Sequence, residues 1–235
     1  MRLCMFHPID HPLERGWVGR IDGEHVIQLA AQTLQSFLTG GGTAREHAVY
    51  PLSAVRLLAP VLHPPAVRVF EDQRSFVFAN PAAICGPDSA VASNEPSNSL
   101  LQGELALFPR LAGMIGADGE VGGFTIFAEW RRLRLPPPKD RDFALALGPV
   151  VVTPDELDPD GLEAAVRVNG EELLRIRFEG FDWARAHEYA AAGTRLRSGD
   201  LLAGPALGSV SVEPGSAVEL DANHIGVLTQ TVLQS

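Results

Sequence analysis

The chain has 235 residues, of which 46% are hydrophobic and 20% charged, so it can bury one substantial core that two lobes could share. Its formal net charge of −10 repels phosphate backbones and its arginines are scattered among acids, which excludes nucleic acid as an expected partner. No apolar run approaches the ~18 residues that a membrane helix needs, and the first residues lack a signal-peptide pattern, so we expect a cytoplasmic protein without membrane contact.

The chain contains two cysteines, Cys4 and Cys85. They lie far apart and form no CxxC spacing, which argues against a disulfide framework or a zinc cluster. We expect both to be buried free thiols.

Residues 1–62 are predicted to form a small α/β lobe. Alternating apolar and polar residues in 2–6 and 17–29, with a turn near Gly23, indicate strands joined by a hairpin. A helical period follows in 30–38 and should end at the three glycines 40–42. These glycines are not interpreted as a phosphate loop, because no Lys-Ser or Lys-Thr follows them. Another short strand is expected at 57–62.

Residues 63–235 are predicted to form a β-rich lobe. Short strands separated by Gly, Pro and Asp turns are typical of a sheet sandwich or a rolled barrel. One helix is expected at 182–192, with Asp182 as its N-cap and Gly193 as its stop signal. The strand candidates are residues 75–78, 101–108, 123–129, 148–153, 164–168, 173–178, 200–203, 217–220 and 226–233.

Several separate segments, in order, resemble the fumarylacetoacetate hydrolase family. They are FVFANPAAICGP at 76–87, LQGELALF at 101–108, GGFTIFAEW at 122–130, KDRDFALALGP at 139–149, YAAAGTRLRSGDLLAG at 189–204 and IGVLTQTV at 225–232. The resemblance implies an α+β, β-rich fold: a mixed β-sandwich or β-roll carrying the active-site cleft, preceded by the small N-terminal lobe. It also implies a homodimer and an enzyme that acts on small oxo acids at a divalent metal.

In this family an E-x-E pair and a third carboxylate on a neighbouring strand hold the metal. Residues i and i+2 of a strand share a face, so such a set forms an oxygen-rich half-shell suited to Mg²⁺, Mn²⁺ or Ca²⁺. The resemblance places Gln102 and Glu104 at the pair and Glu129 at the third position. One neutral amide with two carboxylates attracts a hard cation less than three carboxylates do, so either a weak metal site or no metal is expected.

The resemblance gives Lys139 the catalytic role of holding a substrate carboxylate or a developing oxyanion. It places Gly204 and Ala206 in the turn that binds an anionic small-molecule substrate. Here Pro205 removes an amide donor and Ala206 removes a hydroxyl, so substrate recognition should differ from that of the family. We expect the side-chain ends of Lys139, Glu104 and Glu129 to lie within ~10 Å of one another, the reach of one small ligand.

The family's general-base histidine has no counterpart in residues 68–73. Without such a base, activation of water loses a factor of about 10² to 10⁴. Glu71 or Asp72 could replace it, although both are expected to be solvated surface carboxylates. Among the histidines, His7 and His11 are the nearest candidates for a base carried on a lid.

Three functional hypotheses remain open. The first is a metal-dependent enzyme that hydrolyses a carbon–carbon bond, decarboxylates or tautomerises a small oxo acid or dicarbonyl compound. The second is a metal-free isomerase or cyclase of a biosynthetic pathway. The third is a non-catalytic homologue that binds a metabolite.

Overall fold

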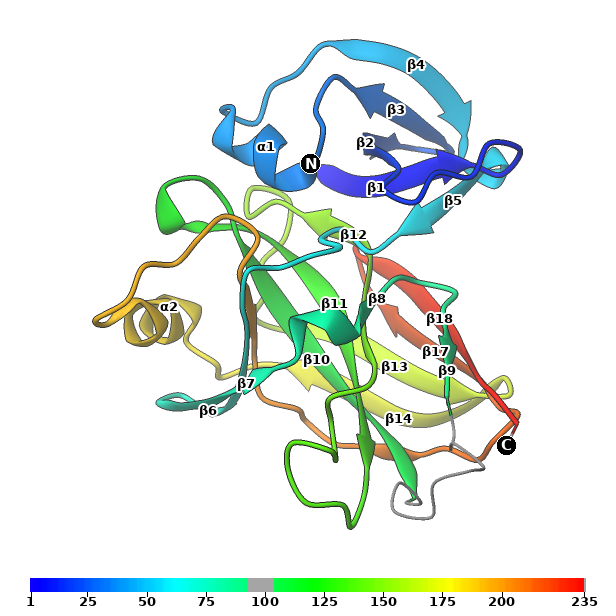
Figure 1. The fold of residues 1–235 in the computed structure, drawn as a ribbon, viewed down its shortest axis with the longest axis vertical. Coiled ribbons are helices and arrows are strands. Elements are labelled where there is room, and N and C mark those ends of the chain that lie inside the picture. The colour runs from blue at the N-terminus through cyan, green and yellow to red at the C-terminus, as the bar shows by residue number, and fades with distance from the viewer. Residues whose placement is uncertain (93–103, 235) are drawn as a thin grey trace.

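The computed structural model describes residues 1–92 and 104–234, and its N-terminal lobe lies at the top of Figure 1. The predicted hairpin is present, with Gly23 in its turn at φ +57°, a conformation that favours glycine. The predicted helix is present too, capped by Thr33, whose side chain accepts the backbone N–H of Ser36. The elements are β1 (Arg2–Pro8), β2 (Trp17–Asp22), β3 (His25–Leu29), α1 (Leu34–Thr39), β4 (Glu46–Pro51) and β5 (Val55–Leu58).

The second lobe is the predicted β-rich one. Its helix is capped by Asp182 as expected, and its strands occupy most of the predicted positions. The elements are β6 (Val67–Asp72), β7 (Ser75–Ala79), β8 (Ile84–Cys85), β9 (Ala90–Val91), β10 (Leu105–Ile115), β11 (Val121–Arg132), β12 (Leu145–Val152), β13 (Leu162–Val168), β14 (Glu171–Phe178), α2 (Trp183–Ala191), β15 (Leu201–Ala203), β16 (Val210–Ser211), β17 (Ala217–Ala222) and β18 (Gly226–Val232).

Within the described residues the strands form two sheets. The larger has 13 strands in the order β4-β3-β2-β1-β12-β11-β10-β15-β6-β7, with β5 beside β1, β8 beside β12 and β16 beside β10. The smaller has the order β14-β13-β17-β18-β9. The α+β, β-rich architecture is therefore confirmed, with mixed sheets folded over a shared core.

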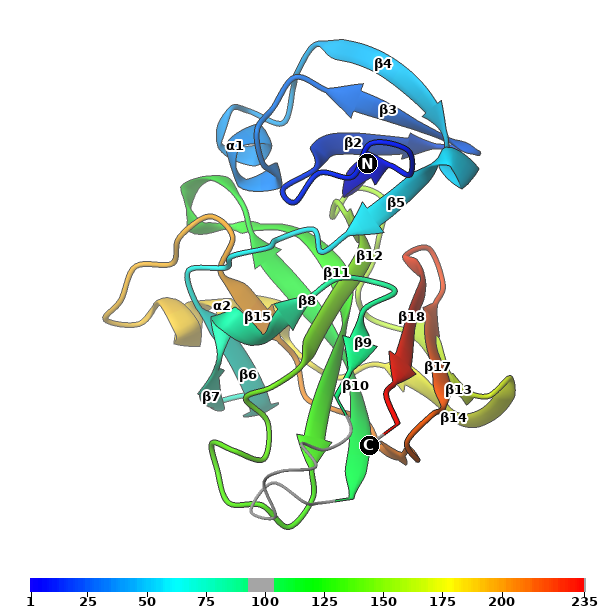
Figure 2. The same ribbon diagram turned by 45° about the vertical axis from the view of Figure 1, so that its right-hand side comes forward.

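The two lobes share a sheet, because Arg2 and Leu3 of β1 pair with Val152 and Val151 of β12. Figure 2 shows the N-terminal lobe seated on this end of the second lobe. A connection between β5 and β6 spans the predicted boundary near residue 62, and we retain that boundary as a proposal.

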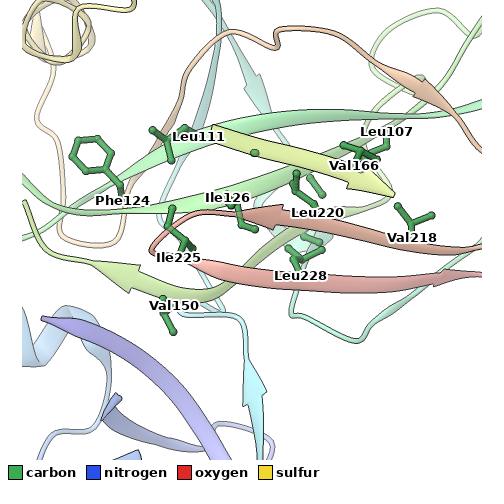
Figure 3. Close-up of a cluster of buried hydrophobic side chains, with 14 of the residues drawn as sticks. Leu107, Leu111, Phe124, Ile126, Val150, Val166, Val218, Leu220, Ile225 and Leu228 are labelled. Carbon is green, nitrogen blue, oxygen red and sulfur yellow. The ribbon is translucent and has the colours of Figure 1, made fainter. Parts of the chain in front are cut away.

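The main core lies where the β10–β11 hairpin faces the smaller sheet (Figure 3). Leu107, Leu111 and Ile126 of the hairpin meet Leu220 and Leu228 of β17 and β18 there, all of them buried. Burying such side chains contributes about 1.5 to 3 kcal/mol each. One face of the hairpin therefore packs into this core. Side chains on the opposite face, which alternate with the core residues along each strand, are not part of it.

Cys4 is buried and Cys85 half-buried, and both are free thiols. Burial raises the pKa of Cys4 to about 12. In the part of the chain that the structure describes, neither helix is long and apolar enough to cross a membrane.

Candidate functional site

A group of charged side chains lies on the face of the β10–β11 hairpin opposite the face that packs into the main core. We call it the arginine cluster; it consists of Arg110, Arg131, Arg141, Glu71 and Glu129. Arg110 lies on β10 and Glu129 and Arg131 on β11, where i and i+2 share a face. Glu71 lies near the end of β6, and Arg141 lies in the loop before β12.

Arg110 is the centre of the cluster. Its Nε donates to Oε2 of Glu129 at 2.7 Å, and both side chains have no exposed surface. Its Nη1 donates to the carbonyl oxygens of Phe70 and Gly204, each at 2.8 Å. A buried charge persists only when it is paired and hydrogen-bonded, and these bonds tie β10 to β11, to β6 and to the end of β15.

The other two arginines face the solvent side of the cluster, where Glu71 is 44% exposed. Arg131 Nη2 lies 2.9 Å from Glu129 Oε2 and 3.1 Å from Glu71 Oε1. Arg141 Nη1 lies 3.0 Å from the same oxygen of Glu71, and Arg110 Nη2 lies 3.7 Å from it. Three guanidinium groups therefore converge on one partly exposed carboxylate oxygen.

The charges shift one another's protonation. Burial opposes the ionised form of Glu71, but its arginine neighbours outweigh that effect and lower the pKa of Glu71 below its ordinary value. Burial lowers the pKa of Arg110, against the attraction of Glu129 and Glu71. For Arg141 burial acts in the same direction, but hydrogen bonding to Asp140 and the nearby carboxylates raise the pKa overall. Glu71 is therefore ionised at neutral pH and is a poor base there.

Some buried polar atoms of the cluster make no hydrogen bond within the described residues. They are Nη2 of Arg110, Nε of Arg131 and Oε1 of Glu129. Buried polar atoms in native proteins normally have partners, either protein groups or small polar molecules. The cluster thus combines unused donors with access from the side of Glu71.

Glu104 forms no ion pair with this cluster in the described residues, and the prediction that its side-chain end lies within ~10 Å of Glu129 and Lys139 stays a prediction. Glu104 is exposed, accepts the hydroxyl of Ser211 at 2.7 Å, and lies opposite Leu133. Glu129 lies opposite Phe108, four positions along β10, which amounts to about 13 Å along the strand. Gln102, the other predicted metal ligand, lies outside the described residues.

Lys139 is 63% exposed and donates to Oδ2 of Asp142 at 2.8 Å. It lies two residues before Arg141, in the same loop, and its only ion pair that we find in the described residues is with Asp142. Gly204 is buried and reaches the cluster through its carbonyl oxygen, whereas Ala206 is half-buried beyond Pro205. Of the predicted substrate-binding residues, Gly204 therefore contacts the cluster directly.

Of the residues that could replace the missing general-base histidine, one lies in the arginine cluster and the others lie elsewhere. Glu71 lies in the cluster, whereas Asp72 accepts the backbone N–H of Arg74 in the turn that follows β6. His7 is buried in β1 with Nδ1 beside the carbonyl oxygen of Pro8, and His11 is exposed in the loop after β1.

The three arginines were not foreseen from the sequence. Glu129 and Arg131 share an i, i+2 spacing that predicts a common face, and this was a usable signal. Arg110 is the single charged residue of the apolar segment LALFPRLAGMI, and nothing in this local pattern indicated a functional role for it.

A divalent metal does not fit the residues around Glu129. Phe108, which faces it across the ladder, offers no oxygen, and Arg110 already holds one oxygen of its carboxylate. Hard dications prefer several oxygen ligands and are repelled by an adjacent guanidinium group. Among the residues that the structure describes, there is no group of three or more His, Cys, Asp and Glu side chains that could hold a metal ion. Gln102 lies outside these residues, so the predicted ligand set of Gln102, Glu104 and Glu129 stays a prediction.

Comparison with known proteins shows the family to which this chain belongs. A family model described as fumarylacetoacetate hydrolase, C-terminal, matches residues 58–233, most of the chain. The chain belongs to this family, as the sequence segments indicated. Comparison with curated protein sequences gave no match.

Solved structures with the same fold cover the whole chain. Maleylpyruvate hydrolase from Sphingobium sp. SYK-6 matches with a TM-score of 0.83 at 21% identity, covering 100% of both chains. Another structure of that enzyme is a complex with manganese(II) and pyruvate. A 5-carboxymethyl-2-hydroxymuconate delta-isomerase from Mycobacterium smegmatis matches at 0.77 and 24%, again over 100% of both chains. A 2-keto-3-deoxy-D-arabinonate dehydratase complexed with magnesium and 2,5-dioxopentanoate matches at 0.79 and 17%, covering 100% of this chain and 99% of the other. The TM-scores show that this chain shares the fold of these structures.

Proposed function

We propose that this chain binds a small oxo acid or dicarbonyl compound at the arginine cluster and promotes formation of its enol or enolate, as in tautomerisation or decarboxylation. The observation that carries the proposal is the convergence of three guanidinium groups on the half-exposed carboxylate of Glu71. Arginine binds carboxylates through several parallel hydrogen bonds, and an incoming carboxylate could take the place that Glu71 holds.

Relatives of the same fold support this substrate class. The hydrolase complex with pyruvate and the dehydratase complex with 2,5-dioxopentanoate both contain small oxo compounds. The family membership carries the general expectation of an enzyme, and the named neighbours include a hydrolase, an isomerase and a dehydratase.

The cluster favours reactions that build negative charge on an oxygen next to a carbonyl carbon. Arg131 and Arg141 would hold the substrate carboxylate, while the unused Nη2 of Arg110 would face the carbonyl oxygen that becomes the enolate. Fixed donors aimed at developing charge stabilise a transition state without reorganisation. Decarboxylation needs no base, because carbon dioxide leaves and its bonding electron pair stays on the enolate, whereas in tautomerisation the α-proton passes to solvent water. Hydrolysis needs a base that activates the attacking water, and Glu71 is poorly suited to that role because its pKa is lowered.

Metal-dependent hydrolysis of a carbon–carbon bond is the second candidate. It is favoured by the manganese and magnesium in the structures of two neighbours, and in it Lys139 would bind the substrate anion. It requires Mg²⁺, Mn²⁺ or Ca²⁺ to be held by ligands other than the residues around Glu129. Binding of a metabolite without turnover, the third hypothesis, is distinguished from both by the experiment below.

The experiment is calorimetric titration of the protein with pyruvate and oxaloacetate, for wild type and for Arg131→Met and Arg141→Met. Hydrogen bonds to charged groups are worth about 1.5 to 3 kcal/mol, so each variant should bind at least about tenfold more weakly. Arg175→Met, on exposed β14, is the control and should bind as wild type does. Equal affinity in wild type and both cluster variants would contradict the proposal.

Enolisation is tested separately by NMR in D₂O. Pyruvate methyl protons should exchange for deuterium faster with wild type than with Arg131→Met. Binding without faster exchange would leave the third hypothesis, a metabolite-binding homologue, in place of the enzyme.

We also propose, from the family resemblance, that the protein is a cytoplasmic homodimer. Light scattering coupled to gel filtration should then give twice the chain mass of 25.2 kDa. A mass equal to one chain would contradict the dimer.

A further inference from the structure

We infer that the guanidinium group of Arg110 takes the place of the family's divalent metal beside Glu129. The positive charge at this site would then come from a side chain and not from a bound ion. The inference rests on the register of β10 and β11 and on the charges around Glu129, and it does not depend on the substrate proposed above.

The register supplies the first step. Phe108 lies directly opposite Glu129, and Arg110 follows Phe108 by two residues on the same face. Phe108 and Arg110 are therefore the i, i+2 pair that lies nearest to Glu129 across the ladder, although the resemblance assigns the family's E-x-E pair to Gln102 and Glu104. Beside Glu129 this pair supplies an aromatic ring and a cation, and no carboxylate.

The side chains at both positions are integrated into the cluster. The guanidinium carbon of Arg131 lies 4.4 Å from the centre of the Phe108 ring, a cation–π distance. Arg110 donates to the side chain of Glu129 and to two backbone carbonyls at normal hydrogen-bond distances. Phe108 and Arg110 thus each have a partner that a carboxylate at the same position would lack.

The charges supply the last step. Oε2 of Glu129 accepts from Arg110 at 2.7 Å and from Arg131 at 2.9 Å, so two cations share one carboxylate oxygen. A dication at the same carboxylate would meet both of them at close range, inside a site with little solvent to screen the repulsion. The second carboxylate of the cluster, Glu71, is likewise surrounded by arginines. The cluster already holds three cations against two carboxylates, so a metal would add to an excess of positive charge.

The test measures Mn²⁺ binding by electron paramagnetic resonance and calorimetry. Wild type should show no stoichiometric site up to millimolar Mn²⁺, and its thermal unfolding should be the same with Mn²⁺ and with EDTA. The triple variant Phe108→Glu, Arg110→Glu, Arg131→Ala gathers three carboxylates and removes two cations. It should bind one Mn²⁺ per chain at least a hundredfold more tightly than wild type.

The control is Arg175→Glu with Arg185→Glu, which makes the same change in net charge on two exposed elements, β14 and α2. It should gain no stoichiometric site. The inference would be overturned by one Mn²⁺ per chain on wild type that is lost in Glu129→Gln, or by a folded triple variant that gains nothing over the control. If the triple variant does not fold, the wild-type and Glu129→Gln titrations decide the question alone.

Discussion

At the scale of single residues, Arg110 and Glu129 form a fully buried ion pair whose members depend on each other. Removing one partner of such a pair leaves an uncompensated charge and costs about 3 to 5 kcal/mol, whereas removing both can be nearly neutral. Arg110 also satisfies two carbonyl oxygens, which adds to the cost of its loss.

We therefore expect Arg110→Met to lower the free energy of unfolding by about 3 to 5 kcal/mol in urea titrations. The double variant Arg110→Met, Glu129→Leu should lose less than the sum of the two single variants. Arg175→Met removes an exposed pair with Glu172 and should cost no more than about 1 kcal/mol. Strict additivity of the two buried changes would contradict the pairing.

Glu71 makes the stability of the protein depend on pH. Because its folded pKa is lowered below the ordinary value of 4.5, its contribution is fully present above about pH 4.5 and is lost as pH falls through the folded pKa. The difference in unfolding free energy between wild type and Glu71→Gln should be constant near neutrality and should shrink below pH 4.5. A difference that grows on acidification would show that the pKa is raised instead. Asp72→Asn, in the adjacent turn, is the control.

At the scale of elements, the β10–β11 hairpin positions the cluster, and its closeness to β12 limits what its residues can be. A Cβ atom on Gly123 would lie 2.5 Å from a methyl group of Val151 and 2.7 Å from the carbonyl oxygen of Val152. On Gly113, in β10, the nearest atoms would be at 3.4 Å, an ordinary contact. Neither glycine has a positive φ, so space alone distinguishes them.

Gly123→Ala should therefore destabilise the protein by about 1 to 3 kcal/mol, since backbone has to move, while Gly113→Ala should change stability by less than about 1 kcal/mol. Both are measured by urea unfolding of otherwise identical proteins. Equal effects of the two substitutions would count against the β11–β12 packing described above.

The sequence predicted most strands of the second lobe and its helix, because alternation, turn residues and caps are local signals. It missed β4 of the first lobe, and in the second lobe it missed β6 and the two-residue strands β8, β9 and β16. In β6 the residues from Val67 to Phe70 are all buried, so no alternation marks the strand. Strand ends were also displaced: β10 runs to Ile115, well beyond the predicted end at residue 108.

The site was predicted only in part for a related reason. Glu129 was predicted as a site residue and lies at the centre of the cluster, whereas its partner Arg110 was not predicted. Nearly every residue of β10 is buried, so the sequence has no two-residue period that shows which residues face Glu129. Register between strands is a non-local property, so the sequence did not show that Arg110 lies beside Glu129.

At the scale of the whole molecule, the two predicted lobes are joined by more than a linker. β1 pairs with β12, and one cluster of buried side chains includes Leu3 and Met5 of β1 together with Phe127, Leu147 and Val151 of the second lobe. Elements that share a sheet and a core lose stability together.

We therefore expect a single cooperative thermal transition in calorimetry. For the monomeric chain, measured under conditions in which the proposed dimer is dissociated, the calorimetric and van't Hoff enthalpies of unfolding should agree. Two separated transitions, one of them assignable to residues 1–62, would instead show that the lobes unfold independently.

The central claim is that a small oxo acid binds at the arginine cluster without the help of a metal. The most direct measurement is the dissociation constant for pyruvate, determined by calorimetry on one preparation with EDTA and again with millimolar Mn²⁺. We predict the same constant under both conditions, and weaker binding in Arg131→Met under both. Binding that disappears in EDTA and returns with Mn²⁺ would contradict the account and restore the metal-dependent alternative.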